Sequence, residues 1–301
     1  AELVSIASAT GVTAALAARK FGFAGSTTDY HTILEDPRVN TVFIMTRHHQ
    51  HVPMAIEALQ AGKHVFVEKP AAIDPDGLAK LRAAFDATDG LQLLVGFNRR
   101  FSPHAEKIRQ LLSNRAQPVC MNMLVNAGYI PADHWVQDPR TGGGRIIGEG
   151  CHWVDLLRFC VNSPIDSVQA VTVGDSPGLE TVDDKMTISL RFADGSLGNV
   201  HYFANGSKTY VKERLEVHSE GRTLVLDNFK SLVGFGWSNF RKLNFWSQDK
   251  GQRAEVSGFV RRVADGGAPM MPAHEIWNVT AATFAAVDSA KSGNSVVLAE
   301  K

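Results

Sequence analysis

The stretch that most constrains the fold of this chain is residues 62–70, with the sequence GKHVFVEKP. Gly62 is typical of the residue that ends a helix, because glycine adopts the left-handed backbone conformation without strain. Residues 65–67 (VFV) form an uninterrupted apolar run, as in a parallel strand that is covered on both faces. The stretch therefore predicts a helix end followed by a buried strand of an α/β sheet.

Two charged residues and a proline follow this strand. In an open α/β sheet, ligands bind at the carboxyl ends of the strands, where Glu68 and Lys69 fall. Pro70 disfavours helical geometry at Lys69 and holds it extended. A lysine at this place can hydrogen-bond a substrate hydroxyl and help to move its proton. An ordinary solvated strand end carries the same residues, so the stretch alone leaves both interpretations open.

The first part of the chain alternates strands and helices as βαβ units do. Asp74 and Pro75 give an N-cap followed by proline at the first helical position, which is a strong helix start. We expect a Rossmann-type, doubly wound parallel sheet with right-handed crossovers over residues 1–100. The expected strands are 3–7, 42–45, 65–67 and 91–97, and the expected helices are 11–20, a short one begun by Asp29, 52–61 and 77–87.

A dinucleotide-binding domain should begin one strand earlier, with a G-x-G-x-x-G turn that leads into its first helix. Neither that strand nor the glycine turn precedes residues 3–7, and the chain begins at Ala1 without a methionine. We therefore expect a fragment of a longer protein, whose missing piece supplies a buried strand, the glycine turn and a helix. Without that piece the sheet should have a hole in its middle.

Residues 101–301 show a different pattern, in which segments alternate like half-buried antiparallel strands. We expect an α+β domain with a large, open and mostly antiparallel sheet, whose exposed face suits homo-oligomerisation, as a dimer or tetramer. The aromatic-rich stretch 234–246 is interpreted as edge strands or a subunit contact. The expected strands are 119–126, 168–173, 186–192, 197–203, 215–218 and 223–226, and the expected helices are 105–112, 151–160 and 273–292.

Length and charge limit the class of protein. The 301 residues allow two domains with sizeable cores. Lys plus Arg and Asp plus Glu number 31 each, so neither a nucleic acid nor a membrane surface is indicated as a partner. Three cysteines make no disulfide framework. No signal peptide and no apolar run near the ~20 residues of a membrane span is visible, so a soluble, cytoplasmic protein is expected.

The order of several short motifs is similar to that of the glucose–fructose oxidoreductase / inositol dehydrogenase family (Gfo/Idh/MocA). The resemblance implies an NAD(P)-dependent dehydrogenase that transfers hydride at a CH–OH group of a sugar, polyol or nucleotide-sugar. It is dense over the first half of the chain and covers the rest in outline. Its motifs are Asp29-Tyr30, Ile33-Leu34, the strand 42–45, Thr46, His51, Glu68-Lys69-Pro70, residues 96–103 (GFNRRFSP), Gly143-Gly144 and His152.

The expected cofactor site begins directly after strand 3–7. An acidic residue usually stands at the end of this strand to bind the ribose hydroxyls of NAD. This chain has Ser8 and Thr10 there and no carboxylate, which admits the 2′-phosphate of NADP. Arg19 belongs to the following helix and is not placed to bind that phosphate, so NAD and NADP both stay open. Ser8 and Thr10 could equally cap the helix.

The resemblance extends the cofactor site to the ends of the next strands. It places Thr46 and His51 beside the nicotinamide and its ribose, and adds Glu68, Lys69 and Asn98. His51 could equally make a structural hydrogen bond at a helix start. The chain has Arg47-His48 where the family commonly has Pro-Asn, a departure that affects the cofactor contacts. The histidines of residues 46–51 (TRHHQH) suggest zinc only weakly, because no second cluster supplies further ligands.

The second catalytic candidate lies in residues 141–155, TGGGRIIGEGCHWVD. The family pattern is similar to G-G-x-L-x-D-x-G-x-H-x-x-D, with the first aspartate and the histidine working beside the lysine. This chain has Gly148 in place of that aspartate, and Glu149 should point elsewhere on a helical turn. We expect Lys69 and His152 to form the proton-handling pair, with His152 near its ordinary pKa of ~6.5. The alternative for His152 is a satisfied core histidine.

Substrate contacts are expected from Arg99, Trp135, Arg145 and His152, although the first three could equally be domain-interface contacts. Two competing functions remain open. A non-catalytic dinucleotide- or sugar-binding regulatory protein is favoured by the loss of the aspartate at Gly148. The other competing function is an NAD-dependent glycoside hydrolase, since some relatives with this fold do that chemistry with tightly held NAD.

Overall fold

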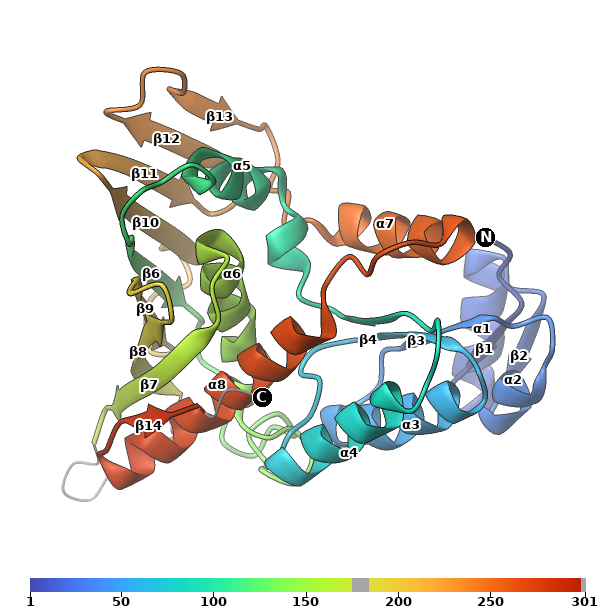
Figure 1. Cartoon of the computed structure of the whole chain (residues 1–301). Coiled ribbons are helices and arrows are strands. Elements are labelled where there is room, and N and C mark those ends of the chain that lie inside the picture. The colour runs from blue at the N-terminus through green and yellow to red at the C-terminus, as the bar shows by residue number, and fades with distance from the viewer. Residues whose placement is uncertain (175–183, 299–301) are drawn as a thin grey trace.

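The computed structural model describes residues 1–174 and 184–298. Figure 1 shows a smaller α/β part built from the first residues beside a broad sheet built from the later ones. The first part comprises β1 (Ser5–Ala7), α1 (Gly11–Phe21), β2 (Gly25–Thr27), α2 (His31–Glu35), β3 (Thr41–Ile44), the 3₁₀ turn η1 (His48–Gln50), α3 (His51–Gln60), β4 (His64–Val67), α4 (Pro75–Asp86) and β5 (Leu93–Val95).

The second part begins at a 3₁₀ turn that links the two. Its elements are η2 (Asn98–Phe101), α5 (Pro103–Leu112), β6 (Cys120–Asn126), the π-helical turn η3 (Ile146–Gly150), α6 (Cys151–Val161), β7 (Ile165–Thr172), β8 (Lys185–Phe192), β9 (Leu197–Phe203), β10 (Glu213–Ser219), β11 (Arg222–Asp227), β12 (Ser231–Phe235), β13 (Lys242–Asn244), α7 (Gln252–Asp265), α8 (Ala273–Ser292) and β14 (Val296–Val297).

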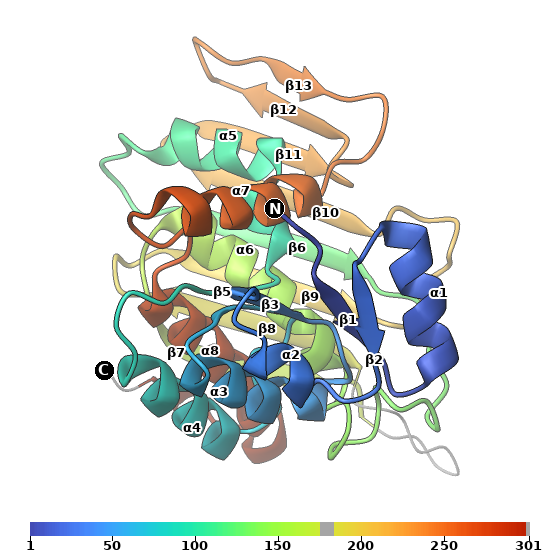
Figure 2. The same cartoon turned by 90° about the vertical axis from the view of Figure 1, so that its right-hand side faces the viewer.

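The parallel sheet of the first part is divided in two among the described residues. β1 pairs only with β2, while β3, β4 and β5 form a separate three-stranded sheet in that order. In Figure 2 the β1–β2–α1 unit stands beside the three-stranded sheet. The expected interruption in the middle of the sheet is thus confirmed. β2 was absent from the expected elements, because three residues (GST) carry no apolar pattern.

The predicted buried strand and helix starts are confirmed. Val65, Phe66 and Val67 of β4 are at most 2% exposed, as an apolar run between two covered faces requires. Asp74 accepts a hydrogen bond at 2.7 Å from the backbone N–H of Gly77, which makes it the cap of α4. These two features fix the strand end that carries Glu68 and Lys69.

The second part is built on a nine-stranded sheet in the order β13-β12-β11-β10-β6-β9-β8-β7-β14. Neighbouring strands are antiparallel, except that the central pair β6 and β9 is parallel, so the sheet is mixed. Alternate residues of the strands face a core covered by α5, α6 and α8 (Figure 1). The packing of α6 on this face is close: a Cβ added at Gly198 of β9 would lie 2.9 Å from Leu157 Cδ1.

One helix, α7, was not predicted, and it returns from the second part to the first. Its Phe259 makes an edge contact with Phe43 at 5.8 Å between ring centroids and lies 6.0 Å from Phe66. α7 thus covers the face of β3 and β4 opposite α3 and α4 (Figure 1). α7 therefore contacts the first domain although its residues lie beyond the expected domain boundary near residue 100. That boundary stays a prediction.

The stretch 234–246 forms the outer edge of the sheet. β12 and β13 pair antiparallel there, which confirms the interpretation as edge strands. Trp246 is fully exposed. A subunit contact at this edge stays a prediction.

Buried ion pairs join η2 to α6, α8 and β10. Arg100, 1% exposed, donates to Asp155 of α6 and to Glu275 of α8. Arg99 donates to Glu213 of β10 at 2.6 Å. Breaking such a pair would leave an uncompensated buried charge, so these contacts hold the turn after β5 firmly against α6 and the sheet.

Candidate active site

The ammonium group of Lys69 reaches across to the glycine loop. Lys69 Nζ donates a hydrogen bond of 2.8 Å to the carbonyl oxygen of Gly148, 79 residues away in the sequence. The contact joins the carboxyl end of β4 to the π-helical turn η3, which leads directly into α6. The two catalytic candidates from separate halves of the chain are therefore brought to one place.

His152 lies in the first turn of α6, four residues after Gly148. It is 6% exposed, and its Nδ1 is buried without a hydrogen-bond partner. Burial lowers its pKa well below the ordinary value, and the positive charges of Arg99 and Lys69 lower it further. The pKa therefore lies below the unperturbed ~6.5: the imidazole is neutral at neutral pH, so one of its two ring nitrogens is unprotonated.

Glu149 points away from Lys69, as expected for the adjacent position on a helical turn. Its carboxylate accepts hydrogen bonds from Lys212 at 2.8 Å, from Arg145 at 2.9 Å and from the hydroxyl of Tyr202. Burial acts to raise its pKa, but these cations and hydrogen bonds outweigh burial and lower the pKa to about 2. Glu149 is thus a permanently ionised anchor and does not replace the missing aspartate.

The imidazole of His48 fills the space beside Gly148. A Cβ added at Gly148 would lie 2.7 Å from Cε1 and 3.0 Å from Nδ1 of His48. His48 Nδ1 lies 2.7 Å from the carbonyl oxygen of Gly142, and the ring packs edge-on against Trp135 at 4.9 Å between centroids. The sequence showed both departures from the family pattern, at His48 and at Gly148, but the pattern did not reveal that the two positions touch.

Glu68 and Asn98 stand at the ends of β4 and β5. Burial raises the pKa of Glu68, whose carboxyl group packs closely on Gly96: its Oε2 would lie 2.9 Å from a Cβ there. Asn98 is 5% exposed and donates to the carbonyl oxygen of Lys250 at 2.8 Å. Both are held by the protein itself, and their contacts with a cofactor stay a prediction.

Thr46 and His51 lie at the start of α3. The hydroxyl of Thr46 donates to Met54 Sδ at 3.7 Å. His51 is fully buried, with Nδ1 2.8 Å from the carbonyl oxygen of Pro70 and Nε2 3.2 Å from that of Thr46. Burial lowers its pKa, so the neutral ring carries one N–H and donates to only one of these two carbonyl oxygens. These contacts match the structural alternative for His51.

The carboxyl ends of β1 and β3 lie where the sequence predicts a dinucleotide cofactor. Ser8 is half-buried and Thr10 is exposed, and Thr10 makes no side-chain cap hydrogen bond, so it does not cap α1 with its side chain. Met45, directly after β3, is 70% exposed. Hydroxyls for ribose and an exposed apolar side chain for a flat ring are the contacts such a cofactor takes. Whether Ser8 and Thr10 bind it stays a prediction.

Two of the residues expected to contact substrate are engaged inside the protein. The guanidinium of Arg99 is paired with Glu213 and lies 4.8 Å from the centre of the Trp153 ring. Arg145, 2% exposed, donates to the carbonyl oxygens of Gly128 and Ala127 and to Glu149. The contact of Arg99 with Glu213 joins the two expected domains, whereas these contacts of Arg145 all lie within the second one. Trp135 is half-buried against His48, at the surface of the site.

Nucleophilic and metal chemistry receive no support from the described residues. Burial raises the pKa of Cys151 to about 12, so its thiol is protonated. Across residues 1–174 and 184–298, no group of three or more His, Cys, Asp and Glu side chains is arranged to hold a metal ion. His49 contacts Thr141, whereas His48 and His51 face Gly142 and Pro70.

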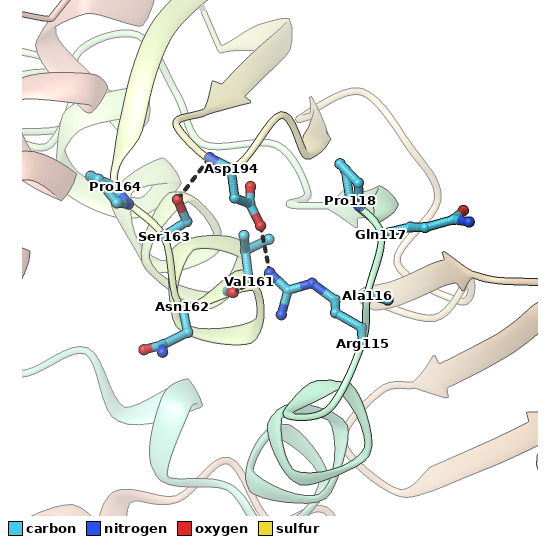
Figure 3. A pocket seen from close by; sticks show the side chains of 9 residues that line it. All are labelled: Arg115, Ala116, Gln117, Pro118, Val161, Asn162, Ser163, Pro164 and Asp194. Carbon is cyan, nitrogen blue, oxygen red and sulfur yellow. Dashed lines mark hydrogen bonds and ion pairs between the residues drawn. The ribbon is translucent and has the colours of Figure 1, made fainter.

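A pocket of about 430 Å³ lies elsewhere, between the end of α6 and the segment before β6. Figure 3 shows Arg115 and Asp194 pointing toward each other across it. The two side chains form an ion pair of 2.5 Å, and the backbone N–H of Asp194 donates to Ser163 Oγ. None of the expected site residues lines this pocket, so it is not the site described above. Among the described residues, no helix has the length and apolar character to cross a membrane.

Several known proteins are similar to this chain in sequence. Levoglucosan dehydrogenase of Pseudarthrobacter phenanthrenivorans is 28% identical over 258 residues, which are 74% of this chain and 64% of that protein. The chain thus covers less than two thirds of that relative's length. Myo-inositol 2-dehydrogenase of Thermotoga maritima is 25% identical over 293 residues, 93% of this chain and 86% of that one.

Similar folds are known among solved structures. A structure of levoglucosan dehydrogenase in complex with NADH and levoglucosan superposes with a TM-score of 0.85 at 25% identity, and the match covers 99% of this chain and 90% of that one. A family model described as an oxidoreductase family with an NAD-binding Rossmann fold matches residues 1–97, and the GFO/IDH/MocA C-terminal domain matches residues 116–225. The chain therefore belongs to the GFO/IDH/MocA oxidoreductase family, with an NAD-binding Rossmann domain followed by the C-terminal domain of that family.

Proposed function

We propose that this protein is an NAD(P)-dependent oxidoreductase that transfers hydride between the nicotinamide and a carbinol carbon of a sugar, polyol or nucleotide-sugar. The observation that carries the proposal is the contact between Lys69 Nζ and the Gly148 carbonyl oxygen. It sets a cationic donor beside the helix turn that carries the neutral imidazole of His152. The names of the relatives, which include levoglucosan and myo-inositol dehydrogenases, support this substrate class.

In this proposal, one residue donates a hydrogen bond to the reacting hydroxyl group and another accepts its hydrogen. Lys69 donates a hydrogen bond to the substrate oxygen and favours the negative charge that develops there when the O–H bond breaks. The free nitrogen of neutral His152 accepts the hydroxyl hydrogen. When bound, the nicotinamide supplies the hydride acceptor or donor. Ser8, Thr10, Thr46, Glu68 and Asn98 would hold that cofactor along the strand ends.

The first test is the variant Lys69→Ala. We expect turnover to fall by about 100-fold or more, because a positioned proton-handling group contributes about 10²–10⁴-fold. NADH and NADPH are titrated separately by nicotinamide fluorescence, and turnover is measured on a panel that includes levoglucosan and myo-inositol. Lys107→Ala is the matched control, since that half-buried lysine of α5 contacts Gln110 at 2.9 Å and the ring of Phe240 rather than the residues of the site.

Three outcomes separate the candidate functions. Saturable cofactor binding with turnover that depends on Lys69 supports the dehydrogenase and identifies the preferred cofactor. Binding without turnover in any variant contradicts it and favours the regulatory binding protein. Glycosidic cleavage with no net reduction of NAD favours the hydrolase.

A further inference from the structure

Three features converge on Gly148. The backbone oxygen of Gly148 accepts from Lys69 Nζ, and the space where a side chain would begin is taken by the imidazole of His48. His152 follows one helical turn later. A glycine is therefore required at position 148 for His48 to occupy this place, because a Cβ there would lie 2.7 Å from the ring.

The hydrogen bond to Gly142 defines the tautomer of His48. A carbonyl oxygen only accepts, so Nδ1 must carry the hydrogen at 2.7 Å from the Gly142 oxygen. In a neutral ring, Nε2 is then an unprotonated acceptor. Burial lowers the pKa of His48 to about 4, and the positive charge of Lys69 acts in the same direction. The other titratable groups that face it are His51 and His49, so the ring is neutral at neutral pH.

The Nε2 atom of His48 has no partner within the described part of the protein. None of its neighbours there donates a hydrogen bond to it, and it is not one of the side-chain atoms that the fold buries without a partner. His48 is only 7% exposed, so the side chain is held in place while this one nitrogen stays reachable. An immobilised ring with a single available lone pair beside Lys69 is suited to accept a hydrogen bond from a bound hydroxyl.

We propose that His48, whose ring takes the space beside Gly148, contacts the substrate and that its Nε2 accepts a hydrogen bond from a hydroxyl of the bound sugar or polyol. This inference rests on the proposed function and adds a specificity-determining contact to the same site. Lys69 supplies the donor, and His48 and His152 supply two separate acceptors. A substrate with two adjacent hydroxyl groups satisfies all three groups.

The kinetic test changes positions 48 and 148, first singly and then together. We expect His48→Ala to lower kcat/KM by about 100-fold, while His48→Gln, which keeps an acceptor, loses less. Gly148→Asp alone is impaired because its Cβ has no room beside His48. The double variant His48→Ala/Gly148→Asp has both the room and an acceptor, and it regains about 10-fold or more over His48→Ala. His49→Ala, on the same turn but exposed, is the control and stays within about twofold of the wild type.

A second readout does not depend on turnover. Long-range ¹H–¹⁵N spectra of the histidine side chains, with His48 assigned by the loss of its signals in His48→Gln, report which ring nitrogen is protonated. We expect protonated Nδ1 and free Nε2 between about pH 5 and about pH 8. Addition of myo-inositol or levoglucosan together with NADH should shift the Nε2 signal. A protonated Nε2, or an unmoved Nε2 signal when the polyol shifts other signals, overturns the inference.

Failure of the inference differs from failure of the proposed function. A wild-type protein that turns over a polyol, with His48→Ala equal to it or with no recovery in the double variant, overturns the role of His48 alone. A wild-type protein that binds neither NADH nor NADPH and turns over no polyol contradicts the proposed function, whatever tautomer His48 adopts.

Discussion

Two neutral imidazoles, those of His48 and His152, lie near the hydrogen-bonded ammonium group of Lys69. Burial and the ammonium of Lys69 both lower the pKa values of His48 and His152, so neither ring adds a second positive charge. A cation beside neutral acceptors matches the donor and acceptor needs of a hydroxyl group. Lys69 could be predicted from the sequence, since the residues around it form a compact local pattern. The contact with Gly148 could not, because it depends on how distant segments pack.

Glu255 on α7 is a buried carboxyl group whose surroundings disfavour its negative charge. It is 2% exposed, and its Oε1 has no hydrogen-bond partner. Burial, together with the negative charges of Glu68 and Asp155, raises its pKa to about 9. Between the unfolded value of 4.5 and about 9, the folded state holds a proton that the unfolded state releases. The stability contributed by this group is therefore lost as the pH rises through this window.

We predict that Glu255→Gln stabilises the protein increasingly as the pH rises. The neutral amide requires no proton uptake on folding, so its advantage in the free energy of unfolding grows by about 1.4 kcal/mol for each pH unit within the window. Urea denaturation at about pH 5 and about pH 8 measures the difference. Glu35→Gln, at an exposed position of α2, is the control and should show no such trend. An equal effect of Glu255→Gln at both pH values contradicts the prediction.

At the scale of elements, the helices and strands that a local sequence pattern marks could be predicted. Those that depend on contacts between distant segments could not. β4 and α4 follow from an apolar run and from a cap formed by Asp74, both local features. α7 was missed because it begins at Gly251 without a side-chain cap and buries only Glu255 and Phe259. The parallel pairing of β6 with β9 was missed because strands distant in sequence meet there, so no local pattern marks it.

The start of α7 gives a test of how closely it docks on η2. Gly251 has a φ of 86°, and a Cβ added there would lie 2.4 Å from the backbone oxygen of Asn98. Gly62 has a similar φ of 73°, but a Cβ there meets nothing within 4 Å. We predict that Gly62→Ala costs about 1 kcal/mol of unfolding free energy through backbone strain alone, and that Gly251→Ala costs at least about 2 kcal/mol more.

Urea denaturation of the two alanine variants measures both effects. A similar loss in the two proteins would mean that α7 is not packed tightly against η2. The prediction concerns stability alone, so it is independent of the substrate.

At the scale of the whole molecule, the site lies where the two parts meet. The first part supplies Lys69 and His48, and the second supplies Gly148 and His152. α7 packs on the first part through Phe259 and Phe43, and the ion pairs of Arg99 and Arg100 hold the turn that links the two parts. In Figure 1 the helices cover one face of the large sheet. The alternation of burial along β7 and β9 puts the exposed residues Val171 and Leu197 on the opposite face. Assembly through that face stays a prediction, as does the cytoplasmic location.

The central claim is that hydride passes directly between a sugar or polyol carbon and the nicotinamide. The most direct test uses levoglucosan or myo-inositol with deuterium on the reacting carbinol carbon, and whichever of NAD and NADP the protein binds. Mass spectrometry of the cofactor after incubation measures the label. The proposed function predicts one deuterium in the reduced cofactor with the wild-type protein, and labelling about 100-fold slower with Lys69→Ala. Oxidised, unlabelled cofactor with the wild-type protein, despite saturable binding of both ligands, would contradict it.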